Sequence, residues 1–454
     1  MIRKLLIANR GEIAVRIIRA CREMGIATVA VYSEADEESL HTQLADEAIC
    51  IGPGPSAQSY LNMEQIISAT MVSGADAIHP GFGFLSENAR FAELCEKCGI
   101  TFVGPPSKVI RMLGNKKIAR STMIAAGVPV VPGSEGDVED IETGLKEAER
   151  IGYPVIIKAA LGGGGKGMRV ANTPEEFPEA YATARKESEI AFGDGTMYIE
   201  HFVVNPRHIE FQILADSFEN VIHLGERDCS IQRNHQKMIE ESPSAAVSPE
   251  LREKMGHAAV TAAKAAGYVN AGTIEFLLEP DGKFWFMEMN TRIQVEHPVT
   301  EWVTGIDLVK EQLKIASGMP LEIAQEDVRI QGHAIECRIN AENPQKNFRP
   351  SPGTIQGAHF PGGNGIRVDT CVYNGCKIPP YYDSMLAKLI VHAGNRKEAI
   401  AKMQSALGEV IIDGIDTNID YQYEILKDED YQSGNFDTGF LASHIIAGVK
   451  INEN

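Results

Sequence analysis

Residues 273–298 of this 454-residue chain read TIEFLLEPDGKFWFMEMNTRIQVEHP. The first seven, which are mostly apolar, predict a strand, and residues 284–290 predict the strand that returns beside it. Between them, PDGK at 280–283 is typical of a hairpin turn. The loop could be Asp281-Gly282 alone or all four residues 280–283. In both cases, the residue numbers of two residues that face each other across the hairpin add up to the same value. Glu275 then faces Glu288, since 275 plus 288 is 563.

The opposed glutamates of this hairpin lie in apolar surroundings. Directly opposed residues have Cβ atoms about 5 Å apart, where like charges are destabilising. Their sequence neighbours are all apolar: Ile274, Phe276, Met287 and Met289. A divalent cation would offset the repulsion, and carboxylate oxygens are ligands that Mg²⁺ prefers. Two alternatives stay open, a solvent-exposed pair in a slipped register and a pair in which one glutamate is protonated.

The polar residues that follow are regularly spaced. Glu288, Asn290, Arg292, Gln294 and Glu296 occupy every second position, which places them on one face of an extended chain. Along that face, oxygen ligands for a metal come first, then a guanidinium and an amide, then a carboxylate. We expect Arg292 to hold a small planar oxyanion with two hydrogen bonds, and Glu296 to act beyond it as a base. The alternative is an exposed strand face.

A glycine run at 162–165, followed by Lys166, predicts a loop whose backbone approaches a phosphate closely. The P-loop pattern GxxxxGK[ST] is absent. Lys158 closes the apolar strand predicted over 154–159 and supports the phosphate interpretation. A plain flexible loop with an exposed lysine is the alternative.

A polar and basic cluster occurs in SIQRNHQK at 230–237, in a chain whose net charge is −19. It contains Gln232, His235 and Lys237, and the last two share a face if the segment is extended. The cluster predicts an anion site, with a solvated loop as the alternative.

The first thirty residues predict a strand at 5–8, a helix from about Glu12 to Met24 and a strand at 27–32. This βαβ unit implies a parallel sheet with a right-handed crossover. Its turn lacks GxGxxG, so a dinucleotide cofactor is not expected. The alternation of predicted strands and helices continues to about Val103, and a second region begins near Gly114. From about Gln331, the pattern becomes rich in strands. The fold class is therefore mixed, α/β followed by α+β.

The composition, 44% apolar and 23% charged, is ordinary for a globular protein. The acidic balance argues against a nucleic-acid partner. No signal peptide or membrane span is recognisable, so a cytoplasmic location is expected. The eight cysteines, including the CxxC of Cys95 and Cys98, are interpreted as scattered reduced thiols.

Five motifs in this order resemble the biotin carboxylase family of the ATP-grasp superfamily, over a span from Ile2 to about Ile446. They are IANRGEI at 7–13, HPGFGFLSEN at 79–88, GGGGKGMR at 162–169, CSIQRNHQK at 229–237 and EMNTRIQVEHP at 288–298. The resemblance implies an N-terminal parallel-sheet αβ domain over 1–113 and an ATP-grasp domain over 114–330 with a mobile lid near 132–204. It further implies a C-terminal mixed β domain over 331–446 and a tail at 447–454.

The resemblance also implies roles for individual residues. The expected ATP contacts are Lys116, Lys158, Gly163, Gly164, Gly165, Met168, Glu200, His201, Val203, His208, Gln232 and His235. Glu275, Glu288 and Asn290 are expected to hold two Mg²⁺ or Mn²⁺ ions. Bicarbonate is expected against Lys237, Arg292, Gln294 and Val295, with Glu296 as the base, while Phe82 and Arg338 serve biotin.

The implied reaction has two steps. Deprotonated bicarbonate attacks the γ-phosphate of ATP to give carboxyphosphate, which then yields CO₂ and phosphate. Phosphate deprotonates biotin, and Arg338 stabilises the resulting enolate. No Met-Lys-Met biotin site is present in the sequence. We therefore expect a separate biotin carboxyl carrier protein and a carboxyltransferase subunit. The resemblance also implies a homodimer, and no membrane partner is expected.

Three positions depart from the family pattern. Position 82 is Phe where Tyr is frequent, Asn234 replaces a usual Arg, and His201 replaces a common Lys. Two competing functions are another carboxyphosphate-forming ATP-grasp ligase, such as a purine-pathway carboxylase or a carbamoyl phosphate synthetase, and an inactive ATP-binding scaffold subunit. The final carboxyl acceptor is left open among acetyl-CoA, propionyl-CoA, pyruvate and others.

Overall fold

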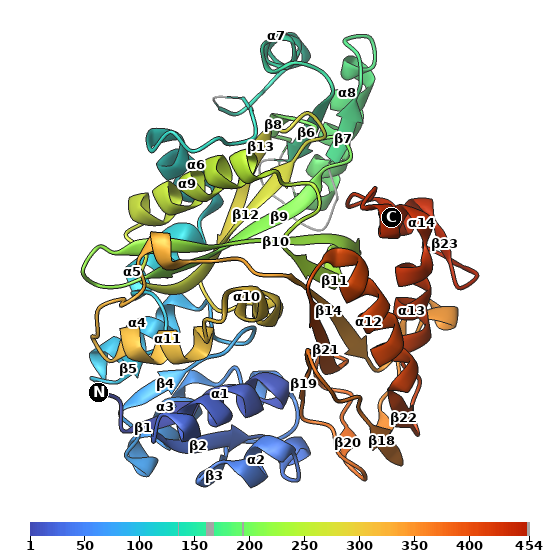
Figure 1. Ribbon diagram of the computed structural model, residues 1–454. Helices are drawn as coiled ribbons and strands as arrows, with labels where there is room; N and C mark the ends of the chain where they lie inside the picture. Colours follow the sequence, from blue (N-terminus) through green and yellow to red (C-terminus); the bar gives the residue numbers. More distant parts are fainter. Residues whose placement is uncertain (135, 160–167, 193–194, 452–454) are drawn as a thin grey trace. The chain divides into compact units, whose positions relative to one another are not determined.

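The computed structural model describes residues 1–134, 136–159, 168–192 and 195–451 (Figure 1). The chain forms two compact units. The main unit comprises Met1–Val128, Arg207–Phe276 and Glu288–Asn454, and the small unit comprises Pro129–Pro206 and Leu277–Met287. Within the described ranges, no helix combines the length and the apolar character that crossing a membrane requires.

The N-terminal part of the main unit is a five-stranded sheet in the order β3-β2-β1-β4-β5, and every pair in it is parallel. Its strands are β1 (Lys4–Ile7), β2 (Ala27–Tyr32), β3 (Glu47–Cys50), β4 (Ala77–His79) and β5 (Thr101–Phe102). Its helices are α1 (Gly11–Glu23), α2 (Leu40–Leu44), α3 (Met63–Ser73) and α4 (Ala89–Lys97). The predicted βαβ unit and parallel sheet are confirmed.

Both faces of this sheet are buried, which explains the continuous apolar run of its first strand. Leu5 and Ile7 pack in one core cluster with residues of α1, whereas Leu6 and Ala8 pack in another with residues of α3 and α4. Alternate side chains of a strand point to opposite faces, so a strand covered on both sides needs apolar residues throughout.

The second sheet of the chain has eight strands in the order β13-β12-β9-β10-β11-β14-β21-β19. These are β9 (Arg207–Ala215), β10 (Val221–Arg233), β11 (Gln236–Ser242), β12 (Asn270–Leu278), β13 (Phe284–Asn290), β14 (His333–Asn340), β19 (Ile366–Thr370) and β21 (Met385–Ala393). Because β11 pairs with β14, the expected boundary near residue 330 falls inside one hydrogen-bonded sheet. The domain boundaries stay a prediction.

Two tight turns differ from the predicted geometry. The backbone N–H of Glu279 donates to the oxygen of Lys283, and that of Gly282 donates to the oxygen of Glu279. Residues 280–282 therefore form a three-residue loop, and opposed positions at the turn sum to 562 because 279 plus 283 is 562. The predicted sum of 563 is wrong there. Gly282, with φ 86°, is in the left-handed conformation that such a loop requires.

The second turn joins β10 to β11. Asn234 and His235 both have positive φ, and Gln232 is paired with Lys237 across the two strands. The expectation that His235 and Lys237 share the face of an extended segment is wrong, because the chain reverses between them. Asparagine adopts this backbone conformation readily, which suits position 234 to such a turn.

The extended segment predicted over 288–296 ends early. β13 stops at Asn290, and α10 (His297–Thr304) begins directly after Glu296, with Pro298 in its first turn. Proline is favoured at this position because its missing N–H is one of the donors that a helix start leaves unused. The alternating face is therefore wrong beyond Asn290, although the turn folds several of its residues back together.

Helices flank the eight-stranded sheet in Figure 1. They are α5 (Ser107–Leu113), α6 (Lys116–Ala125), α9 (Pro249–Ala265), α11 (Leu308–Ala316), α12 (Arg396–Glu409), α13 (Ile419–Lys427), α14 (Glu429–Ser433) and α15 (Phe440–Ser443). Helices α13, α14 and α15 follow α12 in the described part of the chain. The remaining strands are β15 (Glu342–Asn343), β16 (Arg349–Pro350), β17 (Gly353–Thr354), β18 (Gly357–His359), β20 (Lys377–Ile378), β22 (Ile411–Asp413), β23 (Ile445–Ile446) and β24 (Val449–Lys450).

The small unit has its own antiparallel sheet in the order β7-β6-β8. Its elements are α7 (Ile141–Ile151), β6 (Val155–Ala159), β7 (Met168–Ala171), α8 (Phe177–Phe192) and β8 (Met197–His201). A separate apolar cluster, which includes Val155, Phe177 and Ile199, forms its core.

Candidate active site

The side chain of Lys237, on β11, is the centre of the candidate site. Its Nζ donates to Glu210 Oε2 at 2.5 Å, to Glu275 Oε1 at 2.9 Å and to Glu296 Oε1 at 2.7 Å. Burial alone would lower the pKa of Lys237, but these three carboxylates raise it well above its usual value. The ammonium therefore stays charged, with all three of its N–H donors used.

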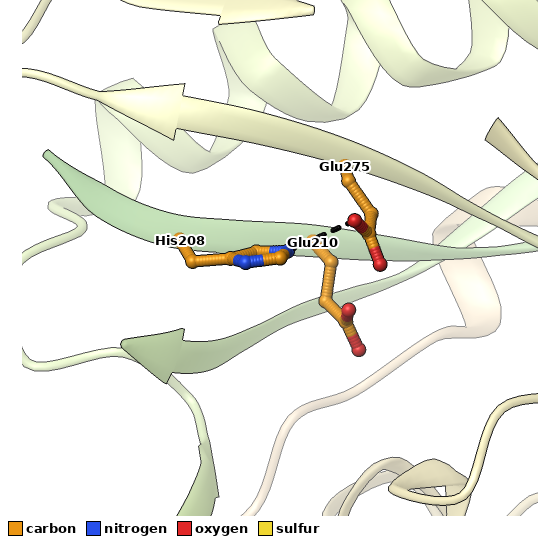
Figure 2. A group of neighbouring side chains, drawn as sticks. All are labelled: His208, Glu210 and Glu275. Carbon is orange, nitrogen blue, oxygen red and sulfur yellow. Dashed lines mark ion pairs between the residues drawn. The ribbon is translucent and has the colours of Figure 1, made fainter. Parts of the chain in front are cut away.

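Glu275, on β12, accepts hydrogen bonds from several directions. Besides Lys237, Asn290 Nδ2 and Gln294 Nε2 each donate to its Oε1 at 2.8 Å. Its Oε2 lies 3.1 Å from His208 Nε2 (Figure 2). Burial raises the pKa of Glu275, but Lys237 and His208 outweigh burial, so the pKa lies below its ordinary value.

Glu288, on β13, has the opposite electrostatic environment. Burial first and the charge of Glu275 second raise its pKa, although Lys116 at the start of α6 opposes the change. The two glutamates therefore repel each other, as the sequence predicted from their proximity. A divalent cation between them would remove that repulsion, so their carboxylates and the nearby Asn290 amide fit Mg²⁺. The role of these residues as metal ligands stays a prediction.

His208, Glu210 and Glu275 also lie close enough together to share a metal ion (Figure 2). However, the ammonium of Lys237 donates to both carboxylates of this group. A positive charge is thus already present between them, and a metal ion there would have to displace it. The oxygens of Glu275 and Glu288 that Lys237 does not bind are the better candidates.

Glu296, just before α10, lies between two cations. Lys237 bonds its Oε1, and Arg338 Nη2 on β14 lies 3.0 Å from its Oε2. Burial raises the pKa of Glu296, but Lys237, Arg338 and Arg227 lower it well below its ordinary value. The expected base is therefore ionised, and its two partners are cations that an anionic substrate can also bind.

Arg292 and Val295 contribute at the edge of this cluster. Arg292 donates from Nη2 to Asn290 Oδ1 at 3.0 Å and from Nε to Glu87 Oε2 at 2.9 Å. The backbone oxygen of Val295 accepts from the buried Lys388 Nζ at 2.9 Å. The residues that the sequence placed on one straight face are thus brought together by a turn.

The other predicted ATP residues of the main unit, Gln232 and His235, lie at and beside the β10–β11 turn, where Gln232 is buried and His235 is exposed. Phe82, expected near biotin, is half-buried in a turn whose backbone is held by Asn9, since Asn9 Nδ2 donates to the Phe82 oxygen at 2.7 Å.

The remaining predicted ATP residues belong to the small unit. Lys158 on β6 forms an ion pair with Glu200 on the neighbouring β8. His201 Nδ1 lies 3.3 Å from the oxygen of Gly152, and Val203 is largely buried. Met168 begins β7 and is half-exposed. Gly163, Gly164 and Gly165 lie outside the described residues.

Four buried side chains of the site were not predicted from the sequence. They are Glu210, Arg227, Glu240 and Glu336. Glu240 accepts from Arg338 Nε at 2.6 Å and is directly opposed to Glu336 across β11 and β14. In the described ranges, Oε2 of Glu240 and both carboxylate oxygens of Glu336 have no hydrogen-bond partner. Arg227 lies between Glu226 and Asp228, and Glu240 precedes Glu241, so these charged runs resemble those of exposed strand faces and do not distinguish buried residues.

An antiparallel sheet with paired carboxylates and phosphate-type cations defines an ATP-dependent ligase of the ATP-grasp class. In agreement, the carbamoyl-phosphate synthase L chain ATP-binding domain model matches residues 115–324. The biotin carboxylase N-terminal and C-terminal domain models match residues 1–110 and 336–443.

Similar proteins agree with the family models. Biotin carboxylase 1 of Bacillus subtilis (strain 168) is 59% identical over 449 residues, which cover 99% of this chain and 100% of that protein. A pyruvate carboxylase subunit of Methanothermobacter thermautotrophicus is 54% identical over 97% of this chain and 90% of its own length. The chain therefore belongs to the biotin carboxylase family.

One solved structure adds a bound state. The biotin carboxylase domain dimer of Hydrogenobacter thermophilus 2-oxoglutarate carboxylase, in complex with MgADP, ADP and bicarbonate, has a TM-score of 0.88 and 52% identity over 98% of each chain. The mixed fold and the ligase class expected from the sequence are confirmed.

The Glu240–Glu336 pair leads to a prediction about stability. Burial raises the pKa of Glu336 well above its usual range, and the charge of Glu240 adds to this. The folded protein thus binds a proton that the unfolded chain releases above pH about 4.5, so this contribution to stability is lost as the pH rises. Glu336→Gln should remove this loss. We expect the free energy of unfolding of the variant, minus that of wild type, to increase as the pH rises from 5 to 8. The increase should be at most about 1.4 kcal/mol per pH unit.

Glu241 provides the matched control. It is also buried on β11, but His333 and Arg396 outweigh burial and lower its pKa. Glu241→Gln should therefore destabilise the protein by an amount that does not shrink over this pH range. Denaturant unfolding at several pH values measures both variants, and curves for Glu336→Gln and wild type that run parallel would contradict the prediction.

Proposed function

We propose that this chain carboxylates biotin on a separate carrier protein, using ATP and bicarbonate and passing through carboxyphosphate. The observation that carries the proposal is the ionised Glu296, bonded on one oxygen to Lys237 and on the other to Arg338. A carboxylate base between two anion-binding cations suits a substrate that must be bound as an anion and then deprotonated. The homologues favour this function over another carboxyphosphate-forming ligase or an inactive scaffold.

In the first step, bicarbonate binds against Lys237, Arg292, Gln294 and the backbone of Val295. Its negative charge then shares the cations that hold the pKa of Glu296 low, so the pKa of Glu296 rises toward a value useful for a base. Glu296 takes the bicarbonate proton on a carboxylate oxygen, and the bicarbonate oxygen attacks the γ-phosphate of ATP. The cations around it stabilise the charge that develops during transfer.

The nucleotide and metal residues complete this step. Lys116, Lys158 and His208 contact the phosphates or ribose, while Glu200 and Val203 offer backbone groups to adenine, as in the family. Glu275 and Glu288, with Asn290, would hold Mg²⁺ or Mn²⁺, which when bound neutralises the charge of the phosphates.

In the second step, carboxyphosphate gives CO₂ and phosphate, and phosphate takes the proton from the biotin ureido nitrogen. Arg338 stabilises the enolate that forms, and the ureido nitrogen then attacks the carbon of CO₂ to give N-carboxybiotin. The guanidinium of Arg338 is fixed for this role by Glu240 on β11 and by Glu296 just before α10, which both bond it. The Phe82 ring lies near biotin in the family pattern, without the hydroxyl that tyrosine would supply.

The partners and location belong to the same proposal. A biotin carboxyl carrier protein and a carboxyltransferase subunit would complete the enzyme, and the chain would form a homodimer in the cytoplasm. Two of the named relatives belong to pyruvate and 2-oxoglutarate carboxylases, the latter as a dimer. The final carboxyl acceptor stays open.

The experiment that tests the function measures ADP release by the purified chain with Mg²⁺ and ATP, with and without bicarbonate and free biotin. We expect biotin to accelerate ADP release only when bicarbonate is present. Stimulation by ammonia or by an aminoimidazole ribotide in place of biotin would support a different ATP-grasp ligase, and ATP binding without turnover would support the scaffold.

The assignment of Glu296 as the base predicts the effect of Glu296→Gln. Loss of the base should lower bicarbonate-dependent ATP cleavage by roughly 10²–10⁴-fold and leave the Kd for ATP within about twofold. Glu241→Gln is the control, because Glu241 is an equally buried glutamate that bonds Arg396 and His333 but touches neither Lys237 nor Arg338. Weakened ATP binding with normal turnover would exclude Glu296 as the base.

The role of Arg338 predicts a difference between the two steps. Arg338→Gln should lower biotin carboxylation by roughly 10²–10³-fold, because charge stabilisation of the enolate is lost. Bicarbonate-dependent ATP cleavage without biotin should fall much less. Both rates are measured on the same folded preparation, with Arg396→Gln as a control on α12, and equal losses in the two rates would count against the enolate role.

A further inference from the structure

Arg227, on β10, is the largest fully buried side chain of the described residues, with an exposed fraction of 0%. Its Nε donates to Glu210 Oε1 at 2.5 Å. Its two terminal nitrogens donate to Gln212 Oε1 at 2.8 Å, Thr300 Oγ1 at 3.0 Å, Thr273 Oγ1 at 3.1 Å and Gln294 Oε1 at 2.8 Å.

These five bonds use every N–H donor that a guanidinium has. The group is planar and rigid, it is always charged, and it can only donate. The five acceptors come from strands β9 and β12, from helix α10 and from the turn before that helix. Arg227 therefore fixes how these elements present their polar side chains to one another.

The consequence is sharpest for the amide of Gln294. Its Oε1 accepts from Arg227, and its Nε2 donates to Glu275 Oε1 at 2.8 Å. A guanidinium only donates and an ionised carboxylate only accepts, so a flipped amide would lose both hydrogen bonds. The N–H side of Gln294 is thereby directed to the side of the site where Glu275 and Lys237 meet.

Arg227 also touches the site through a second neighbour. Glu210 accepts from Arg227 on Oε1 and from Lys237 on Oε2, the latter at 2.5 Å. One guanidinium thus holds Gln294 directly and Lys237 through its partner Glu210, and both Gln294 and Lys237 are expected to bind bicarbonate. The side chain of Arg227 itself has no exposed surface, so it cannot contact bicarbonate directly.

We propose that Arg227 is a positioning residue for bicarbonate, which holds the Gln294 amide in the orientation that presents its N–H to the anion. This inference rests on the proposed function and adds to it the reason why Gln294 can serve as a donor. Without Arg227, only the bond to Glu275 holds the amide in this orientation, so its oxygen turns more readily toward an anionic substrate, which repels it.

A purely structural role for Arg227 makes a different prediction. A buried arginine with five bonds stabilises the fold, and its loss would then lower the amount of active protein without changing the affinity for any one substrate. Positioning of Gln294 instead affects bicarbonate selectively. The KM for bicarbonate, compared with the KM for ATP, separates the two roles.

The test uses Arg227→Lys in the full chain, since lysine keeps the charge but has three donors from one atom. We expect the KM for bicarbonate in ATP cleavage to rise roughly tenfold, and the KM for ATP to stay within about twofold. Arg396→Lys is the control, because Arg396 is a partly buried arginine, with 16% of its side chain exposed, that bonds Glu241 and two backbone carbonyls on another part of the main unit. It should leave both KM values unchanged.

A double-mutant cycle tests whether Arg227 acts through Gln294. In the Gln294→Ala background, Arg227→Lys should raise the KM for bicarbonate by less than about threefold, because the amide it positions is gone. The same factor in both backgrounds would overturn the proposal. Wild-type protein without bicarbonate-dependent ATP cleavage would contradict the proposed function, whereas active wild type with an unchanged KM in Arg227→Lys contradicts only this inference.

If Arg227→Lys does not fold, Thr300→Val replaces it. This nearly isosteric change removes one acceptor that holds the guanidinium and leaves Gln294 intact. We expect a rise of about threefold in the KM for bicarbonate and none in the KM for ATP. An unchanged KM for bicarbonate in the folded Thr300→Val protein would likewise overturn the proposal.

Discussion

The interaction on which the site depends is the contact of one ammonium group, that of Lys237, with three carboxylates. Glu210, Glu275 and Glu296 come from separate parts of the sequence, and each would be expensive to bury alone. Lys237 offsets their mutual repulsion and makes a dense acidic cluster compatible with a folded core. The same arrangement keeps Glu296 ionised and therefore able to accept a proton when an anion enters.

Around this centre, opposite charges alternate only as far as Glu240, which then faces a second carboxylate. Arg338 bonds both Glu296 and Glu240, while Glu240 faces Glu336 across the next strand pair. Such networks stabilise a single arrangement only when most members are satisfied. Glu336, whose carboxylate oxygens have no partner in the described part of the chain, is where this network is least satisfied. Neutralisation by a proton is the least costly state for a carboxylate in that position.

The sequence predicted the parallel sheet and the proximity of Glu275 to Glu288, but it did not predict how the polar residues meet. Periodicity identified β1 and β2 because alternation and apolar runs depend on local residues. The hairpin register was wrong by one residue because the loop at Gly282 contains three residues, a difference that the composition of PDGK does not reveal. The segment after Asn290 was predicted as extended, whereas the helix start at Pro298 bends it. The sequence did not indicate a role for Arg227, because its hydrogen-bond partners lie up to 73 positions away in the chain.

The eight-stranded sheet connects regions that the family models treat as separate. β11 and β14 are neighbours in it, although the boundary expected near residue 330 lies between them in the sequence. The ladder between these strands also places Glu240 beside Arg338. In a chimera of two relatives joined at that boundary, β11 would consequently come from one parent and the β14 that pairs with it from the other. Recombination in this family should therefore succeed only between parents whose β11 and β14 have diverged together.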